Sequence, residues 1–238
     1  MEPAPEEFAR GARAVAEQAA QRIQPGMRLG LGSGRMAVAF VEALQPQIGV
    51  GLKVRGLCTS RATETLAKSV GVELLVNSVG GLDLDLDGAD EFDSQLNLLK
   101  GGGGALLREK VVAQGSRRFW ILADSSKQVD RLGSAHPVPV EVLCFDWEAS
   151  AALCEARLCC RSELRGGREK PLVTDNGNYL LDLHFPGGLT DAPEVARQLG
   201  QIAGIVGHGL FLGMATAAII FDGDEVCILG DLNRERDL

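Results

Sequence analysis

The sequence predicts an α/β protein in which a mostly parallel sheet domain carries a smaller, inserted α+β domain. Before residue 137, apolar runs typical of strands alternate with segments of helical spacing, and this alternation indicates a parallel sheet covered by helices. From Val138 the order becomes strand, helix, strand, strand, helix, strand, which is the split unit of ferredoxin-like domains. We expect residues 1–136 and 211–238 to form the large domain and residues 137–210 the small one.

In the large domain, apolar spacing and chain breakers mark each element in turn. Phe8, Ala12, Val15, Ala19 and Ile23 recur at helical spacing, and a Pro-Gly pair follows them. Later strands are expected at 28–31, 54–58, 72–76, 82–87, 119–123, 215–221 and 225–229, and residues 96–100 lead into a run of four glycines. Later helices are expected at 36–44, 61–70 and 105–114. We expect the last two strands to return to the first sheet.

Capping residues locate one of these helices with particular clarity. Ser60 is a plausible N-cap, because its hydroxyl can accept from the first free N–H groups of the helix. Glu64 and Lys68 are four residues apart and can pair along the helix, and Gly71 can end it. A proline is expected to end the preceding helix before residue 46.

The small domain shows similar local signals. Asn176-Gly177 lies between two strand patterns as a hairpin turn, and Asp191 with Glu194 predicts a capping box at a helix start. The expected strands are 138–143, 172–174, 179–185 and 205 onward, and the expected helices are 147–160 and 192–203.

Composition limits the classes of function. The 238 residues include 24 Lys and Arg against 32 Asp and Glu, a net charge of −8, which disfavours nucleic acid as a partner. The apolar content of 45% predicts a real core, and the longest apolar stretch, 210–221, is too short to span a membrane. The acidic first ten residues do not resemble a secretory signal, so we expect a cytoplasmic protein.

The cysteines and histidines do not indicate a metal site. No C-x-x-C occurs, and scattered cysteines in a chain of this size are typical of reduced, mostly buried thiols. His136, His184 and His208 also lack the spacing of metal ligands. We therefore expect no metal.

Two glycine-rich segments and one acidic turn are candidates for chemistry. The loop Gly30–Gly34 lies between a strand and a helix, where backbone N–H groups can hold an anion, although its spacing fails the dinucleotide-binding fingerprint. Lys100 precedes four glycines at a helix start, which favours close approach of a ligand to bare backbone. Asp87 and Asp90 lie at the carboxyl end of a strand, where α/β sheets bind ligands. Each feature alone also fits a plain turn or a flexible loop.

Taken together, these segments resemble the A-type ribose-5-phosphate isomerases over nearly the whole chain. Residues 87–113, DGADEFDSQLNLLKGGGGALLREKVVA, are similar almost letter for letter to the DGADE…KGGGGALLREK motif of that family. Further similar segments are residues 30–34, Thr59-Ser60 with Thr63, 123–127, 139–142 and 174–178. The resemblance implies a Rossmann-like large domain with an inserted ferredoxin-like domain. It also implies interconversion of ribose 5-phosphate and ribulose 5-phosphate through an enediolate, without a metal or redox cofactor.

The resemblance also implies a role for each motif residue. Glu109 would be the base, Asp87 and Asp90 would handle hydroxyl protons and ring opening, and Lys100 with the glycine backbone would stabilise negative charge. The residues expected to bind substrate are Gly32, Ser33, Gly34, Arg35, Thr59, Ser60, Thr63, Gly101, Gly102, Gly103 and Lys127. The partner would be a sugar phosphate, with no nucleic acid and no membrane, and the family suggests homodimers or homotetramers.

Two departures from the family pattern affect the phosphate end of the substrate. The chain reads Gly34-Arg35-Met36 where the family usually has Gly-Ser-Thr, and no lysine precedes Lys53 to serve as the family's phosphate-directed lysine. Arg10 or Arg13 is the nearest substitute. Two alternatives therefore stay open: an isomerase of this fold acting on another sugar or sugar phosphate, and a sugar-phosphate-sensing module without catalysis.

Overall fold

The computed structural model describes residues 4–237, so the first three residues of the acidic start and residue 238 lie outside the described part. The chain forms two compact units. The first is Met1–Ala89, Arg108–Gln128 and Gly213–Leu238, and the second is Asp90–Leu107 and Val129–Leu212. Residues 90–107, 129–136 and 211–212 lie in the second of these units, in addition to the range 137–210 expected for the small domain.

The first unit is built on a seven-stranded sheet of order β14-β13-β7-β4-β1-β2-β3. Every neighbouring pair is parallel except β13 and β14. The strands are β1 (Arg28–Leu31), β2 (Arg55–Cys58), β3 (Glu73–Leu74), β4 (Leu84–Asp87), β7 (Phe119–Asp124), β13 (Ala217–Phe221) and β14 (Val226–Gly230). The expected return of the last two strands to the first sheet is confirmed. Because chain order runs outward from β1 on one side and from β4 on the other, the switch point of the sheet lies between these two strands.

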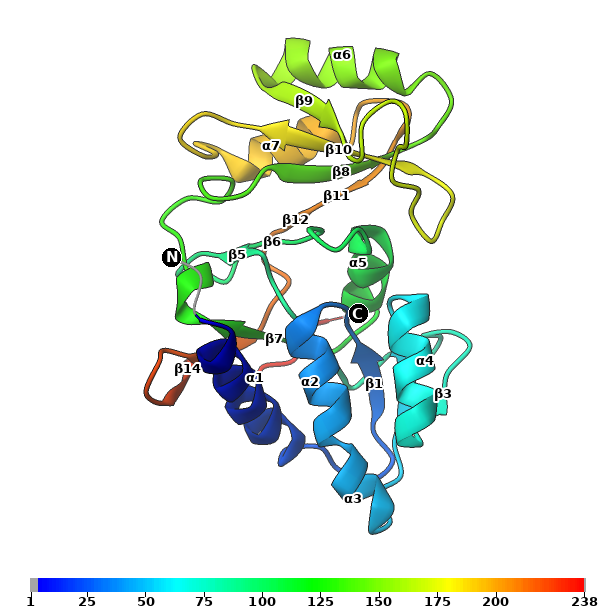
Figure 1. Ribbon diagram of the computed structural model, residues 1–238, viewed down its shortest axis with the longest axis vertical. Helices are drawn as coiled ribbons and strands as arrows, with labels where there is room; N and C mark the ends of the chain where they lie inside the picture. The colour runs from blue at the N-terminus through cyan, green and yellow to red at the C-terminus, as the bar shows by residue number, and fades with distance from the viewer. Residues whose placement is uncertain (1–3, 238) are drawn as a thin grey trace. The chain divides into compact units, whose positions relative to one another are not determined.

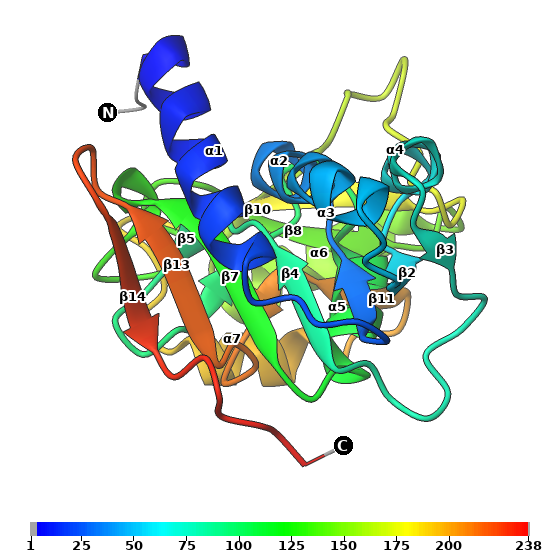
Figure 2. The ribbon, with the colours of Figure 1, turned by 90° about the horizontal axis from the view of Figure 1, so that it is seen from below.

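Helices cover both faces of this sheet. Figure 2 shows the first four helices on one face, namely α1 (Pro5–Ala20), α2 (Arg35–Ala43), α3 (Gln45–Gly49) and α4 (Arg61–Val70). Leu29 and Leu31 of β1 point into the core on that side. Between them Gly30 faces Val112 of α5 (Leu106–Gln114), so α5 covers the opposite face, as alternation along a strand requires.

The second unit contains a four-stranded antiparallel sheet of order β11-β8-β10-β9. Its elements are β8 (Val138–Val142), α6 (Trp147–Leu158), β9 (Arg161–Leu164), β10 (Tyr179–His184), α7 (Ala192–Leu199) and β11 (Ile205–His208). In chain order these strands stand fourth, first, third, second across the sheet, which is the ferredoxin-like arrangement. A small sheet of β5 (Glu91–Phe92), β6 (Leu98–Leu99) and β12 (Leu210–Phe211) completes the unit (Figure 1).

The second strand of this unit was predicted in the wrong place. Residues 172–174 form only an isolated bridge from Val173 to Tyr179. The edge strand that pairs with β10 is instead β9, which was not among the expected strands. The preceding helix ends at Leu158 because Cys159 is left-handed, with φ 51°. β9 is a short edge strand with mostly polar, solvent-facing side chains, so no apolar pattern marks it.

Other boundaries shifted less. The first helix ends at Ala20, short of Ile23, and the proline at position 46 lies in the first turn of α3, where its missing N–H is not needed. The predicted caps at Ser60 and Gly71 are confirmed, because Ser60 accepts from the Thr63 N–H and Gly71 ends α4 with φ 96°. Of the expected capping box, Asp191 accepts from the Glu194 N–H, whereas the Glu194 carboxylate accepts from Arg197 and Gln198.

The last residue of the DGADE motif anchors a loop within the second unit. Glu91 is fully buried, and its carboxylate accepts from the N–H groups of Gly133 (2.6 Å), Ala135 (2.8 Å) and His136 (2.6 Å). Burial alone would raise the pKa of Glu91, but the hydrogen bonds from His136 and from these backbone groups outweigh it and lower the pKa.

We expect Glu91→Gln to destabilise the protein at neutral pH by about 1–3 kcal/mol, because an amide offers one acceptor atom where the carboxylate offers two. A carboxyl whose pKa is lowered by folding stabilises the fold above its unfolded value near 4.5 and loses that contribution as the pH falls through its folded value. The free energies of unfolding of the unmodified protein and of Glu91→Gln should be measured in urea between pH 7 and pH 3.5, and their difference should become smaller toward acid pH. A difference that stays constant with pH would contradict a lowered pKa for Glu91.

Candidate active site

The loop after β1 and the end of β4 meet at the switch point of the first unit. The N–H of Gly32 donates to the Leu86 carbonyl (2.9 Å), and the N–H groups of Ser33 (3.0 Å) and Gly88 (2.7 Å) both donate to Oδ1 of Asp87. Asp87 is buried. A Cβ at Gly32 would overlap the Asp87 carboxyl group, so only glycine permits this approach.

Hydroxyl groups from the segment after β2 hold the same loop from behind. Thr59 and Thr63 are buried; the Thr59 hydroxyl lies 2.7 Å from the Ser33 hydroxyl, and the Thr63 hydroxyl donates to the Gly32 carbonyl (2.9 Å). Ser60 caps α4. The predicted substrate-binding residues Thr59, Ser60 and Thr63 thus make hydrogen bonds that shape the glycine loop and the helix beside it.

Arg35 is the first residue of α2, and its exposed guanidinium lies over the ring of Phe8 in α1, 4.0 Å from the ring centroid. Such stacking restricts the guanidinium while leaving its N–H groups able to donate. Of the two arginines expected to replace the family's lysine, Arg10 donates to the carbonyl of Gly223 (2.6 Å) and lies over the Phe221 ring, whereas Arg13 is exposed.

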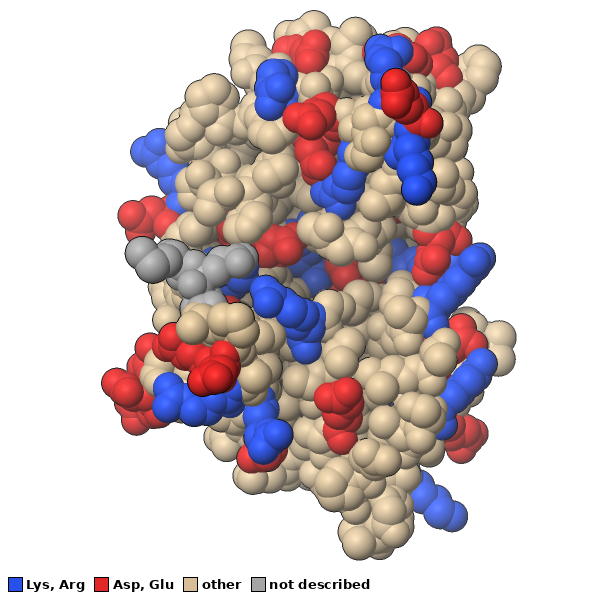
Figure 3. Space-filling view, viewed as in Figure 1, with Lys and Arg blue, Asp and Glu red and all other residues tan. Residues whose placement is uncertain are grey.

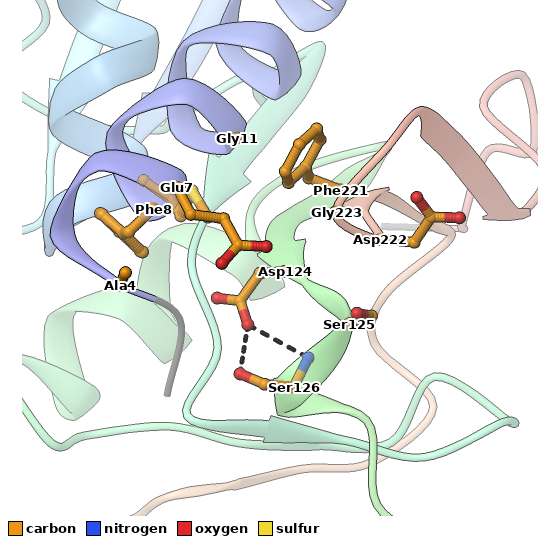
Figure 4. A pocket seen from close by; sticks show the side chains of 11 residues that line it. Ala4, Glu7, Phe8, Gly11, Asp124, Ser125, Ser126, Phe221, Asp222 and Gly223 are labelled. Carbon is orange, nitrogen blue, oxygen red and sulfur yellow. Dashed lines mark hydrogen bonds between the residues drawn. The ribbon is translucent and has the colours of Figure 1, made fainter. Parts of the chain in front are cut away.

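Lys127 is carried by a 3₁₀ turn, Ser125–Lys127, directly after β7. The side chain of Asp124 caps this turn by accepting from the Ser126 N–H (3.1 Å) and from the Ser126 hydroxyl (Figure 4). The same segment forms one wall of a cavity of about 300 Å³ in the first unit. Phe8 and Met36 line this cavity from the helices. Asp222 and Gly223, in the turn after β13, line it as well (Figure 4).

Glu109 lies in the first turn of α5 and is only 5% exposed. The next residue, Lys110, is half-buried, and desolvation lowers its pKa to about 7. A carboxylate in the first turn of a helix lies near the positive end of the helix dipole. These are suitable surroundings for a group that takes up a proton from carbon.

The second unit carries Lys100 and the glycine run. Lys100 is buried, its N–H donates to the Gly209 carbonyl (2.9 Å), and its ammonium lies 5.6 Å from the centroid of the Phe211 ring. Gly101 and Gly104 have φ values of 111° and 83°, which side chains rarely adopt. The run is therefore an ordered structure that requires glycine at these two positions.

Asp90 makes a direct hydrogen bond to this run: its Oδ2 accepts from the N–H of Gly102 (2.7 Å). Arg165, which no sequence signal singled out, donates from Nη1 to the carbonyls of Gly101 (2.8 Å) and Gly102 (3.1 Å). A lone arginine more than 60 positions away in the sequence gives no periodicity or motif from which this contact could be found. The hydrogen bond of Asp90 supports a positioning role beside the predicted acid-base role.

The candidate residues therefore fall in both units. The first carries the glycine loop, Asp87, Glu109 and Lys127, and the second carries Asp90, Lys100 and the glycine run. Within residues 4–237, no group of three or more His, Cys, Asp or Glu side chains is placed to hold a metal ion. No described helix is long and apolar enough to span a membrane. Basic and acidic side chains are intermixed on the face shown in Figure 3.

Comparisons with known proteins agree on one family. The model of the family "Ribose 5-phosphate isomerase A (phosphoriboisomerase A)" matches residues 55–225. The ribose-5-phosphate isomerase A of a Ruegeria species is 43% identical over 227 residues, covering 92% of this chain and 86% of that protein. The one from Methylorubrum extorquens is 45% identical over 231 residues, covering 92% of this chain and 97% of that protein.

Solved structures have the same fold. A ribose 5-phosphate isomerase from Plasmodium falciparum superposes with a TM-score of 0.89 at 33% identity, and a D-ribose-5-phosphate isomerase in complex with phospho-erythronic acid with a TM-score of 0.88 at 31% identity. Each comparison covers 94% of this chain and 99% of the other. The mostly parallel sheet with a separate ferredoxin-like sheet is therefore confirmed as the fold class, and the chain belongs to the ribose-5-phosphate isomerase A family.

Proposed function

We propose that this chain interconverts ribose 5-phosphate and ribulose 5-phosphate by moving one proton between C2 and C1 through an enediolate. The observation that carries the proposal is the placement of the family motif. Asp87, the first residue of the motif, ends β4 at the switch point, and Glu109 is buried in the first turn of α5. The sensing alternative would not need a buried carboxylate at the position of a base.

The proposed mechanism assigns one task to each group. Glu109 removes a proton from C2 of the open-chain aldose and, as the carboxylic acid in exchange with solvent, donates a proton to C1. Lys100 and the backbone of Gly101–Gly103 stabilise the negative charge that develops on the carbonyl oxygen. Asp87, held by two backbone N–H groups, handles hydroxyl protons and ring opening, and Lys127 lines the site.

The phosphate of the substrate is assigned to the loop 32–34 together with Arg35. A helix start behind a glycine turn favours an anion, and the planar guanidinium of Arg35 replaces the two hydroxyls that the family's Ser-Thr would supply. Phe8 fixes the guanidinium by stacking on it.

We expect Arg35→Ala to lower kcat/KM for ribose 5-phosphate by roughly 10- to 100-fold, since a hydrogen bond to a charged group contributes about 1.5–3 kcal/mol. Unphosphorylated ribose should respond little. Arg55→Ala is a matched control, because Arg55 is exposed and begins β2 at the end remote from the carboxyl edge. Equal losses for both sugars would indicate structural damage, and no loss for either would leave Arg35 outside the phosphate site.

An assay for ketose formation from ribose 5-phosphate, run with and without EDTA, tests the activity itself. We expect isomerisation at the same rate in both, because the proposed base and charge-stabilising groups all belong to the protein. Activity lost on chelation would overturn the mechanism. Faster turnover of another aldose phosphate than of ribose 5-phosphate would make that other sugar phosphate the substrate. Ligand binding without turnover of any aldose phosphate would favour the sensing module.

The family resemblance also leads us to propose a cytoplasmic homodimer or homotetramer. Light scattering on the purified protein should then give two or four times the 25.2 kDa of one chain. A mass equal to one chain would contradict this proposal without affecting the mechanism.

A further inference from the structure

Arg165 and Asp182 form a nearly buried ion pair inside the second unit. Arg165 follows β9, Asp182 lies on β10, and their side chains are 17% and 16% exposed. Nε of Arg165 donates to Oδ2 of Asp182 (2.8 Å) and Nη2 donates to Oδ1 (2.5 Å), so the carboxylate holds the guanidinium by two parallel hydrogen bonds. This fork fixes the plane of the guanidinium and directs its third nitrogen.

That third nitrogen binds the glycine run. Nη1 of Arg165 donates to the carbonyls of Gly101 and Gly102, at 2.8 and 3.1 Å. In a planar trans peptide, the C=O and the following N–H point in opposite directions. The first of these peptides is therefore held at both ends, by Arg165 at the Gly101 carbonyl and by Asp90 at the Gly102 N–H.

The second peptide is held by Arg165 at its carbonyl. Because Arg165 binds the Gly102 carbonyl, the N–H of Gly103 points away from Arg165. Gly103 is exposed, and a Cβ there would meet no heavy atom within 4 Å. The Gly103 N–H is thus a backbone donor whose direction is set by a side chain on the opposite side of the peptide.

Consecutive glycines need such an external constraint. They lack the side chains that restrict other residues, so a run of four can rotate its peptide groups at low cost. Residues outside the run must select the working orientation. A lysine in place of Arg165 could not do this, because a single ammonium lacks the rigid fork that contacts a carboxylate and two carbonyls together.

We propose that Arg165, held by Asp182, is a positioning residue that orients the peptide groups of the glycine run for stabilising the enediolate. The inference rests on the proposed function, in which these peptides face developing negative charge. Donors fixed before the reaction stabilise the transition state without reorganising, whereas misdirected donors lower kcat more than they weaken substrate binding.

Kinetics of Arg165→Ala, Arg165→Lys and Asp182→Asn test this role. We expect Arg165→Ala to lower kcat by roughly 10- to 100-fold, somewhat less than the loss of a direct oxyanion donor would. KM for ribose 5-phosphate should change by less than about threefold. Arg165→Lys should recover little of the loss, and Asp182→Asn should lower kcat by several-fold. The matched control is Arg161→Met, because Arg161 lies on β9 with its side chain 69% exposed. This substitution should leave kcat unchanged.

Two further measurements separate positioning from general damage. Added methylguanidinium should restore part of the kcat of Arg165→Ala and none of any deficit in Arg161→Met. Amide hydrogen exchange at Gly102 and Gly104, whose N–H groups donate to Asp90 and to the Gly101 carbonyl, should be faster in Arg165→Ala than in the unmodified protein. This readout requires no activity, so it tests the inference even if ribose 5-phosphate proves not to be the substrate.

Either of two results would overturn the inference. One is a folded Arg165→Ala protein with kcat within about twofold of the unmodified chain. The other is unchanged amide exchange across the glycine run. If Arg165→Ala fails to fold, Asp182→Asn with kcat unaltered would overturn it equally. An unmodified protein that leaves ribose 5-phosphate unreacted would instead contradict the proposed function.

Discussion

Glu109→Gln is expected to lower kcat by roughly 10²- to 10⁴-fold while KM for ribose 5-phosphate stays nearly unchanged. The amide keeps the shape of the carboxylate but cannot accept a proton from carbon. Glu109 is buried in the first turn of α5, so we expect the substitution to remove the proton acceptor and to leave the backbone of the helix unchanged.

Steady-state kinetics of ketose formation should be measured for Glu109→Gln and for a control variant, Glu42→Gln. The control makes the same change at a glutamate near the C-terminal end of α2. The control should behave as the unmodified chain does. Glu109→Gln with near-normal kcat would remove Glu109 from the role of base. A rise in KM with unchanged kcat would place it in substrate binding.

Gly32→Ala is expected to lower kcat by about 10²-fold through Asp87, because a displacement of about 1 Å in a reacting group can cost that much. The new methyl group would overlap the Asp87 carboxyl group. The loop cannot easily retreat, since the Gly32 N–H is bonded to the Leu86 carbonyl at 2.9 Å. The carboxylate must turn away and lose its hydrogen bonds from Ser33 and Gly88.

A second overpacked glycine separates this effect from loss of stability. In Gly56→Ala the added Cβ would lie 2.5 Å from the Leu31 side chain in the same sheet. The nearest atoms to it belong to Leu31 and Val72 and not to Asp87. Both variants should lower the free energy of unfolding by about 1–3 kcal/mol, but only Gly32→Ala should lose most of its kcat. Equal kinetic losses would mean that the effect is on folding alone.

The sequence predicted best those elements whose signals are local. Ser60 and Gly71 bound α4 because a capping hydroxyl and a left-handed glycine act within a few residues. The order of the ferredoxin-like elements followed from alternation along the chain. β9 was missed because this short edge strand has mostly polar, solvent-facing side chains and carries no apolar period.

The parts of the site that depend on distant contacts could not be predicted. The motif indicated Asp87, Lys100 and Glu109, but not that Thr59 and Thr63 would be buried behind the loop. Arg165 and the stacking of Arg35 on Phe8 arise only when segments far apart in sequence pack together. Motif residues can be identified from the sequence, while the residues that orient them require the structure.

Hydrogen exchange at carbon tests the enediolate mechanism most directly. Ribose 5-phosphate incubated with the protein in D₂O should gain deuterium at C2, and the ribulose 5-phosphate formed should gain it at C1, because the carboxylic acid of Glu109 exchanges with solvent during repeated turnovers. Proton NMR would record the loss of the C2 signal of the aldose and of one of the two C1 hydrogens of the ketose, and Glu109→Gln should slow both losses together with kcat. Isomerisation to equilibrium with both carbons still fully protonated would contradict the proposed proton transfer.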